Sequence, residues 1–271
     1  RSTKRINMNY QLRFVHLSPS HRIAGVGMAG NLMIVVNELL MLKDDDTVWV
    51  NMCDYETIAG VNKNESLWSE FFNQFDMSDD STTIDLINRP PNIDYKGRYQ
   101  IDTPIMVKGK ERFFKHFSLT DGMTTDINNF YDNNIKGKET LGCQIRLGDM
   151  VNNHRTADIE EYLAKIKLIL EENPNIEQIF LATDDDKAIN ILENNLDVKI
   201  IYQKEIYRTS SNDPYTRLYD DRTNHNIKLC KEVIMDIFIL TKCDYFLRAD
   251  TSSVSLMTTM FSEHIKKLYF V

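Results

Sequence analysis

The sequence has little of what marks a disulfide-rich, membrane-spanning or nucleic-acid-binding protein. Only four cysteines occur in 271 residues, scattered without a Cys-x-x-Cys pair, so we expect buried thiols rather than a disulfide framework. No apolar run is long enough to span a bilayer. Anionic residues outnumber cationic ones by 40 to 32, a formal charge of −8. That excess argues against a nucleic-acid partner, because phosphate backbones bind clustered Lys and Arg.

No secretory signal is visible at the start of the chain, so we expect a cytoplasmic location. The chain begins without Met, which is typical of a trimmed sequence. A membrane-peripheral protein and a luminal catalytic domain therefore stay open as alternatives.

Hydrophobic residues make up 42% of the chain, enough for a core. The first part predicts a strand, a glycine-containing loop, a helix and a strand, at 12–17, 18–30, 31–42 and 47–52. Residues 60–135 alternate irregularly, and there we expect short helices near 65–76 and 109–119.

After Leu141 the pattern becomes regular. It predicts strands at 141–146, 177–183, 198–202, 244–248 and 267–271, and helices at 157–172, 186–195, 225–241 and 253–263. This alternation implies an α/β fold with mainly parallel sheets, covered by helices on both faces. A boundary near 136–140 predicts an N-terminal α/β domain over 1–138 and a C-terminal α/β domain over 139–271.

A glycine motif lies between the first predicted strand and helix. Gly25-Val-Gly-Met-Ala-Gly30 fits Gly-x-Gly-x-x-Gly, which lets backbone amides approach a diphosphate at a helix N-terminus. No acidic residue of the dinucleotide-binding kind is well placed after the next strand, although Asp54 is near. A loop lining a donor or acceptor site is favoured over a nicotinamide site. Incidental glycines in a flexible loop are the alternative.

Arg146 and Asp149 follow a short apolar strand. Ligands bind at the carboxyl ends of strands in open α/β sheets, and arginine pairs bidentately with phosphate oxygens. The pair therefore suits a phosphate-bearing donor, the alternative being an ion pair that holds a turn.

Three consecutive aspartates, Asp184, Asp185 and Asp186, follow the next predicted strand. They can line a cleft or, as hard oxygen ligands, hold a metal. Aspartate in this position also commonly N-caps the following helix, and we expect that role for one of the three.

Asp236 lies in a strongly apolar predicted helix, where a carboxylate is unfavourable unless it is paired. Its partner can be a nucleobase edge or a donor in the core. Asp250-Thr-Ser-Ser253 then opens another helix, and its hydroxyls and amides can cap that helix, bind a phosphate, or do both.

Four segments in this order resemble the GDP-fucose-dependent fucosyltransferase superfamily, most closely the α-1,6-fucosyltransferases, including the nodulation type. These segments are Gly25–Asn31, Gln144–Asp149, Phe180–Asp185 and Val233–Ser253. The resemblance implies a GT-B-like arrangement of two facing Rossmann-like domains, with the donor nucleotide in the C-terminal half and the acceptor on the N-terminal side. It also implies inversion at the sugar carbon without a required metal or other cofactor.

The resemblance assigns roles by position. Arg146 would neutralise the donor diphosphate, Asp236 would hold the guanine, and Ser252 and Ser253 would contact phosphate. Arg222 is a further candidate for the phosphate or the ribose. The remaining donor-site candidates are those in the resembling segments: Gly25, Gly27, Gly30, Asn31, Gln144 and Asp184.

The sequence departs from the family at two positions. Gln144 stands where the family has His. The family also has a glutamate a few residues beyond the motif aspartate, and in this sequence that region contains His154 and Arg155 instead. We therefore expect Asp149 or His154 to accept the proton of the acceptor hydroxyl.

The sequence thus predicts an inverting glycosyltransferase that moves fucose from GDP-fucose to a glycan or glycoconjugate. Two alternatives stay open. One is an enzyme of the same architecture that uses another GDP-sugar or a UDP-sugar, and the other is a catalytically inactive homologue that binds nucleotide sugars or glycans.

Overall fold

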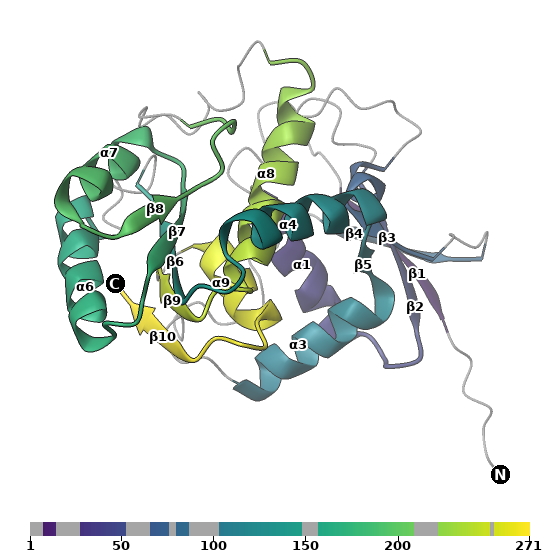
Figure 1. Cartoon of the computed structure of the whole chain (residues 1–271). Coiled ribbons are helices and arrows are strands. Elements are labelled where there is room, and N and C mark those ends of the chain that lie inside the picture. The colour runs from purple at the N-terminus through teal and green to yellow at the C-terminus, as the bar shows by residue number, and fades with distance from the viewer. Residues whose placement is uncertain are drawn as a thin grey trace. The chain divides into compact units, whose positions relative to one another are not determined.

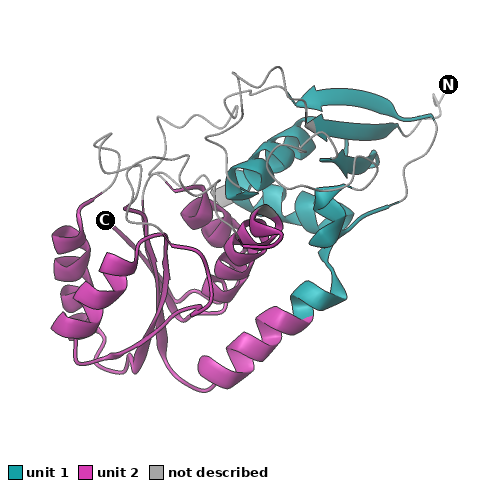
Figure 2. Ribbon diagram, turned by 90° about the horizontal axis from the view of Figure 1, so that it is seen from above, with its two compact units in different colours: residues 1–124 teal, residues 125–271 magenta. Residues whose placement is uncertain are grey.

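A computed structural model describes residues 8–14, 28–52, 66–75, 80–86, 103–147, 157–208, 222–249 and 252–271. The chain divides into two compact units, residues 1–124 and 125–271, coloured separately in Figure 2. Each unit contains its own parallel sheet. The predicted α/β fold with mainly parallel sheets is therefore confirmed.

The sheet of unit 1 has the strand order β2-β1-β4, and both pairs are parallel. Its strands are β1 (Asn9–Phe14), β2 (Thr47–Asn51) and β4 (Thr82–Leu86). Helix α1 (Met28–Met41) connects β1 to β2 and buries an apolar stripe that includes Leu32, Val36 and Leu39.

A second helix of unit 1, α3 (Thr103–His116), packs against α1. Its inner side meets an aromatic cluster in which the rings of Trp68, Phe72, Phe113 and Phe117 contact one another. The cluster is held by the 3₁₀ helix η2 (Leu67–Glu70) and by a short antiparallel pair, β3 (Phe72–Asn73) and β5 (Ser118–Leu119).

The sequence predictions for this region are partly wrong. The helix expected over 65–76 is only a 3₁₀ turn followed by a strand, and the one expected over 109–119 is the second half of α3 followed by β5. Helix α4 (Asp121–Asn134) and strand β4 were not predicted. Residues of α4 from Thr125 onward belong to unit 2.

The sheet of unit 2 has five strands in the order β10-β9-β6-β7-β8, all parallel. The strands are β6 (Thr140–Ile145), β7 (Gln178–Thr183), β8 (Lys199–Ile201), β9 (Tyr245–Arg248) and β10 (Lys267–Phe270). The helices between them are α6 (Ile159–Glu172), α7 (Asp186–Asn195), α8 (His225–Leu240) and α9 (Ser253–Phe261) (Figure 1). These elements match the predicted ones to within about two residues.

Both faces of this sheet are covered, as the continuous apolar strands predicted. On one face Leu141, Cys143 and Ile145 share a core with side chains of α6 and α7. On the other face the Phe180 ring contacts the Phe130 ring of α4. Gly142 lies on that side too, and a Cβ atom there would come within 2.9 Å of Leu240 Cδ2.

The described cysteines are free thiols, and Cys143 and Cys243 are fully buried, as predicted. No helix in the described ranges is long and apolar enough to cross a bilayer.

Candidate functional site

Three strands of unit 2 end at the same edge of the sheet, because parallel strands share their carboxyl ends. Arg146 follows β6, Asp184 follows β7, and Ser252 begins the helix after β9. The chain runs from β6 to β7 and β8 on one side and later returns to β9 on the other side. Such a reversal of strand order opens a crevice at the carboxyl ends, where α/β proteins bind ligands.

Arg146 and Asp184 form an ion pair across the ends of β6 and β7. Arg146 Nη1 lies 3.3 Å from Asp184 Oδ2, and the two side chains are 23% and 27% exposed. Asp184 Oδ1 also accepts a hydrogen bond of 3.2 Å from the Leu147 amide. The carboxylate therefore fixes the start of the loop after β6 and leaves the guanidinium partly accessible to an anion.

Asp185 is the helix cap among the three aspartates. It is the N-cap of α7, it is buried, and its Oδ1 accepts a hydrogen bond of 2.8 Å from the Lys187 amide. The prediction that one of the three aspartates caps the helix is confirmed.

Gln144 lies in the core beneath the edge. The Ser255 hydroxyl donates to Gln144 Oε1 at 2.9 Å and accepts from the Ala249 amide at 3.0 Å. The side chain of Gln144 thereby links β6, the end of β9 and α9. Its predicted contact with a nucleotide stays a prediction.

The amino end of α9 lies at the same edge. Ser252 is its N-cap and is buried, but its side chain makes no capping hydrogen bond. Ser253 is the first helical residue. The first-turn amides of a helix carry a partial positive charge and suit an anion, so this helix end and Arg146 are compatible with phosphate.

Asp236 on α8 pairs with Gln203, which follows β8. Gln203 Nε2 donates to Asp236 Oδ1 at 2.6 Å and to the Glu232 carbonyl at 3.1 Å. Burial raises the pKa of Asp236 to about 7, although the Gln203 hydrogen bond and the Arg208 charge lower it. Of the partners predicted for this carboxylate, the described residues supply a core donor.

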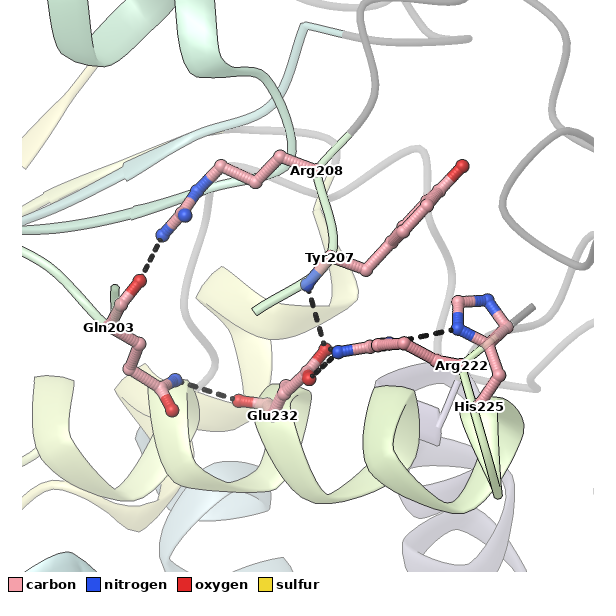
Figure 3. Close-up of polar contacts among 6 residues, drawn as sticks. All are labelled: Gln203, Tyr207, Arg208, Arg222, His225 and Glu232. Atoms are coloured by element: carbon pink, nitrogen blue, oxygen red, sulfur yellow. Dashed lines mark hydrogen bonds and ion pairs between the residues drawn. The ribbon is translucent and has the colours of Figure 1, made fainter. Parts of the chain in front are cut away.

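A polar network extends from Gln203 to residues of α8 and of the segments before it (Figure 3). Glu232 accepts from Arg222 Nη1 at 2.5 Å and from the Tyr207 amide at 3.4 Å, while Arg222 Nε donates to His225 Nδ1 at 3.2 Å. The predicted phosphate or ribose ligand Arg222 is thus engaged with Glu232.

Arg208 anchors the other end of the network. Its side chain is only 3% exposed, its Nη2 donates to the Gln203 carbonyl at 2.6 Å, and its guanidinium lies over the Tyr202 ring. It fixes the backbone at Gln203, whose side chain in turn holds Asp236.

Sequence reasoning missed five members of this network: Gln203, Tyr207, Arg208, His225 and Glu232. One signal was available. Glu232 precedes Asp236 by four residues, so the two carboxylates share a face of α8.

Several predicted site residues lie outside the described part of the chain, namely Gly25, Gly27, Asp149 and His154. Gly30 and Asn31 are described, and both are buried in the first turn of α1. The expectation that the loop continues to Gly30 was wrong, because α1 begins at Met28. Among the described residues no three His, Cys, Asp or Glu side chains group as a metal site.

No family model matches the sequence, and no curated protein matches it. Solved structures do. The fucosyltransferase NodZ from Bradyrhizobium aligns with a TM-score of 0.57 and 10% identity, over 95% of this chain and 94% of that chain. NodZ α-1,6-fucosyltransferase soaked with GDP-fucose aligns with a TM-score of 0.57 and 10% identity, over 94% and 93%. The structure of NodZ α-1,6-fucosyltransferase co-crystallized with GDP aligns with a TM-score of 0.56 and 10% identity, over 95% of this chain and 93% of that chain. The chain therefore has a GDP-fucose fucosyltransferase-like fold, as the sequence resemblance predicted.

Proposed function

We propose that the protein is an inverting glycosyltransferase that transfers fucose from GDP-fucose to a glycan or glycoconjugate. The observation that carries the proposal is the position of Arg146 at the carboxyl end of the central strand β6, beside Asp184. The likeness of fold to NodZ over nearly the whole of both chains supports it. The donor would bind to unit 2, and unit 1 would serve the acceptor.

The diphosphate would bind between Arg146 and the amino end of α9. When the bond from the anomeric carbon to the donor phosphate breaks, negative charge develops on the leaving GDP. A guanidinium and helix N-terminal amides fixed before the reaction stabilise that charge without reorganisation. We propose this as the main catalytic contribution of Arg146, with Ser252 and Ser253 as further phosphate contacts.

The guanine would bind to Asp236. An ionised carboxylate accepts two hydrogen bonds from the N1–H and N2–H groups of guanine. Gln203 binds Oδ1, so it would fix the orientation of the carboxylate, while the second lone pair of Oδ1 and those of Oδ2 remain for the base. Because the carboxylate titrates near neutrality, guanine binding would also select its ionised form.

The acceptor hydroxyl attacks the anomeric carbon from the face opposite the leaving group, which inverts the configuration. With an oxocarbenium-like transition state the proton leaves late, and Asp149 or His154 would accept it. In this scheme the cation of Arg146 neutralises the leaving group, so no metal is required.

We also propose a cytoplasmic location for the protein.

The experiment is thermal unfolding in the presence of GDP, GDP-fucose, GDP-mannose, UDP and ADP. A ligand that binds only the folded protein at about 100 times its Kd stabilises it by about 2.7 kcal/mol. GDP and GDP-fucose should raise the melting temperature most. A larger shift with UDP would contradict the donor assignment in favour of a UDP-sugar.

Catalysis is tested by GDP release from GDP-fucose with a panel of glycans. Release that depends on a glycan supports transfer. Tight GDP-fucose binding without GDP release or donor hydrolysis under any condition would contradict the proposed enzymatic activity and favour a catalytically inactive homologue.

A further inference from the structure

Unit 1 contains a pocket that the proposed reaction does not use. It has a volume of about 820 Å³ and is lined by the end of α1, the segment after it and the helix α3; its lining includes Leu39, Lys43, Val107, Lys108, Lys115 and His116. α1 ends where β2 is about to begin, so the pocket lies toward the amino ends of the parallel strands. The strands of this sheet end at the opposite, carboxyl edge. The pocket is therefore separate from the ligand edge of this sheet.

The pocket is basic although the chain is acidic. Its lining carries four cations (Lys43, Lys108, Arg112 and Lys115) against Asp44 and Glu111, whereas the whole chain has a formal charge of −8. Among the described residues the ammonium groups of Lys43 and Lys108 have no hydrogen bond, and the charge of Lys108 acts on the Asp44 carboxylate. Two cations are thus available to an anion.

Arg112 and Lys115 build the wall of the pocket. Arg112 Nη1 donates to the Leu39 and Leu42 carbonyls, its Nη2 pairs with Asp44, and Lys115 Nζ donates to the Asp44 carbonyl. Cationic side chains commonly bind the unpaired carbonyls at a helix C-terminus in this way. These two residues fix α3 against the end of α1, so the pocket is preformed.

His116 also lines the pocket. The residue is only 8% exposed, and its Nδ1 is buried without a hydrogen-bond partner. Burial and the charges of Lys115 and Arg112 lower the pKa of the imidazole, against the opposing charge of Asp46. The imidazole is therefore mainly neutral at pH 7, and the positive charge of the pocket comes from its lysines and Arg112.

The two helices that line the pocket also carry exposed apolar side chains, of which Val107 belongs to the lining itself. Met41 is 72% exposed, Val107 49%, Ile105 41% and Phe114 40%. Met106 and Phe113 of the same helix are buried, so the inner side of α3 belongs to the core while its outer side carries apolar residues and lysines together. Exposed apolar side chains beside lysines can contact both the acyl boundary and the anionic head groups of a membrane.

We propose that this face of unit 1 binds an anionic phospholipid surface, with a lipid phosphate in the pocket at Lys43 and Lys108. Val107, Ile105, Phe114 and Met41 enter the boundary between head groups and acyl chains. The excess of positive charge in the pocket complements the negative surface of such a membrane.

The test is sedimentation of the full chain with vesicles of phosphatidylcholine alone, or with about one-third phosphatidylserine. The protein should bind the anionic vesicles and not the neutral ones. The double variant Lys43→Gln/Lys108→Gln should bind about 25-fold more weakly, since each lysine near the surface contributes about 1 kcal/mol, or roughly fivefold. Val107→Ser/Phe114→Ser should also weaken binding.

The matched control is Lys167→Gln/Lys199→Gln, which removes the same charge from exposed positions of unit 2. It should bind like the unmodified chain, and all variants should melt alike. Equal binding of the two lysine double variants, or no preference for anionic vesicles, would overturn the proposal. Stabilisation by inorganic phosphate that needs Lys43 and Lys108, without vesicle binding, would also overturn it in favour of a free-anion site. None of these outcomes depends on GDP-fucose.

Discussion

Charged residues are paired differently at the two edges of the unit 2 sheet. At the amino edge, Lys266 Nζ bonds Glu139 Oε1 at 2.6 Å and Asp244 Oδ1 at 3.1 Å. Asp244 Oδ2 in turn accepts from the Thr140 amide at 2.9 Å. At the carboxyl edge, Arg146 and Asp184 are 3.3 Å apart. At the amino edge one cation thus joins two carboxylates, whereas the ion pair at the carboxyl edge joins Arg146 to Asp184 at the edge where α9 begins.

The comparison teaches where function can be placed in such a sheet. At the amino edge the cation Lys266 is bonded to two carboxylates, Glu139 and Asp244. At the other edge the pKa of Asp236 is raised to about 7 by burial, and perturbed groups of this kind gather at functional sites.

Asp236→Asn should weaken GDP binding by about 10- to 100-fold. A hydrogen bond to a charged group contributes about 1.5–3 kcal/mol, and an amide cannot accept from both guanine donors. Titration calorimetry with GDP measures the loss. Asp244→Asn, the same change at the amino edge, is the control and should leave GDP affinity unchanged; equal losses in both variants would remove the distinction between the edges.

Gly142→Ala should destabilise unit 2 by about 1–3 kcal/mol, as overpacking of a filled core does. Gly142 lies in the central strand that supports both edges, and the new methyl group would meet Leu240 at 2.9 Å and Cys243 at 3.2 Å. Chemical denaturation measures the change.

Gly122→Ala on α4 is the control, because nothing lies within 4 Å of a Cβ atom there. It should not destabilise the protein. A Gly142→Ala variant as stable as the unmodified chain would contradict the close packing of β6 on α8.

Stability should depend on pH through Asp236. Its pKa in the folded protein, about 7, is above the ordinary value of 3.8, so the folded state binds more protons between about pH 4 and 7. Stability from this group therefore falls as pH rises through that window and is constant above it. The free energy of unfolding that this group contributes at low pH is at most about 4 kcal/mol, at roughly 1.4 kcal/mol per pKa unit. The partial exposure of the side chain reduces this contribution.

Subtracting the pH profile of Asp236→Asn isolates this contribution from the other carboxylates. GDP affinity should change in the opposite sense and rise with pH up to about 7, since the ionised carboxylate is the acceptor. Profiles that are parallel for both proteins would contradict the raised pKa.

Lys266→Ala should have the smallest effect. Half of the Lys266 side chain is exposed, and exposed ion pairs contribute little to stability. We expect a small fall in melting temperature and unchanged GDP binding. A large loss of GDP affinity would show that the amino edge also serves the ligand.

The sequence predicted unit 2 well because each of its elements has a local signal. Apolar runs such as residues 179–182 alternate with helices that begin at aspartates, and Asp158 and Asp185 are N-caps in the structure. Helix α4 was missed because its many Asn and Asp residues are weak helix formers. Its buried Met123 and Ile127, four residues apart, carried the signal that composition concealed.

The candidate site was predicted in part for the same reason. Arg146, Asp184 and Asp236 stand at strand ends or in an apolar helix, where a charged residue is conspicuous in sequence. Gln203 and Arg208 lie in a polar loop, and their importance depends on the return of α8 beside the end of β8. That pairing spans about 30 residues of chain and cannot be read from local pattern.

The central claim is that Arg146 at the carboxyl edge holds the donor diphosphate. The most direct measurement is GDP-fucose binding and GDP release for the unmodified chain, Arg146→Ala and Lys266→Ala. Removing one preorganised donor to developing charge typically lowers turnover about 10²- to 10³-fold, so Arg146→Ala should lose binding and turnover while melting normally, and Lys266→Ala should keep both. Near-normal binding and turnover in a folded Arg146→Ala variant would contradict the account.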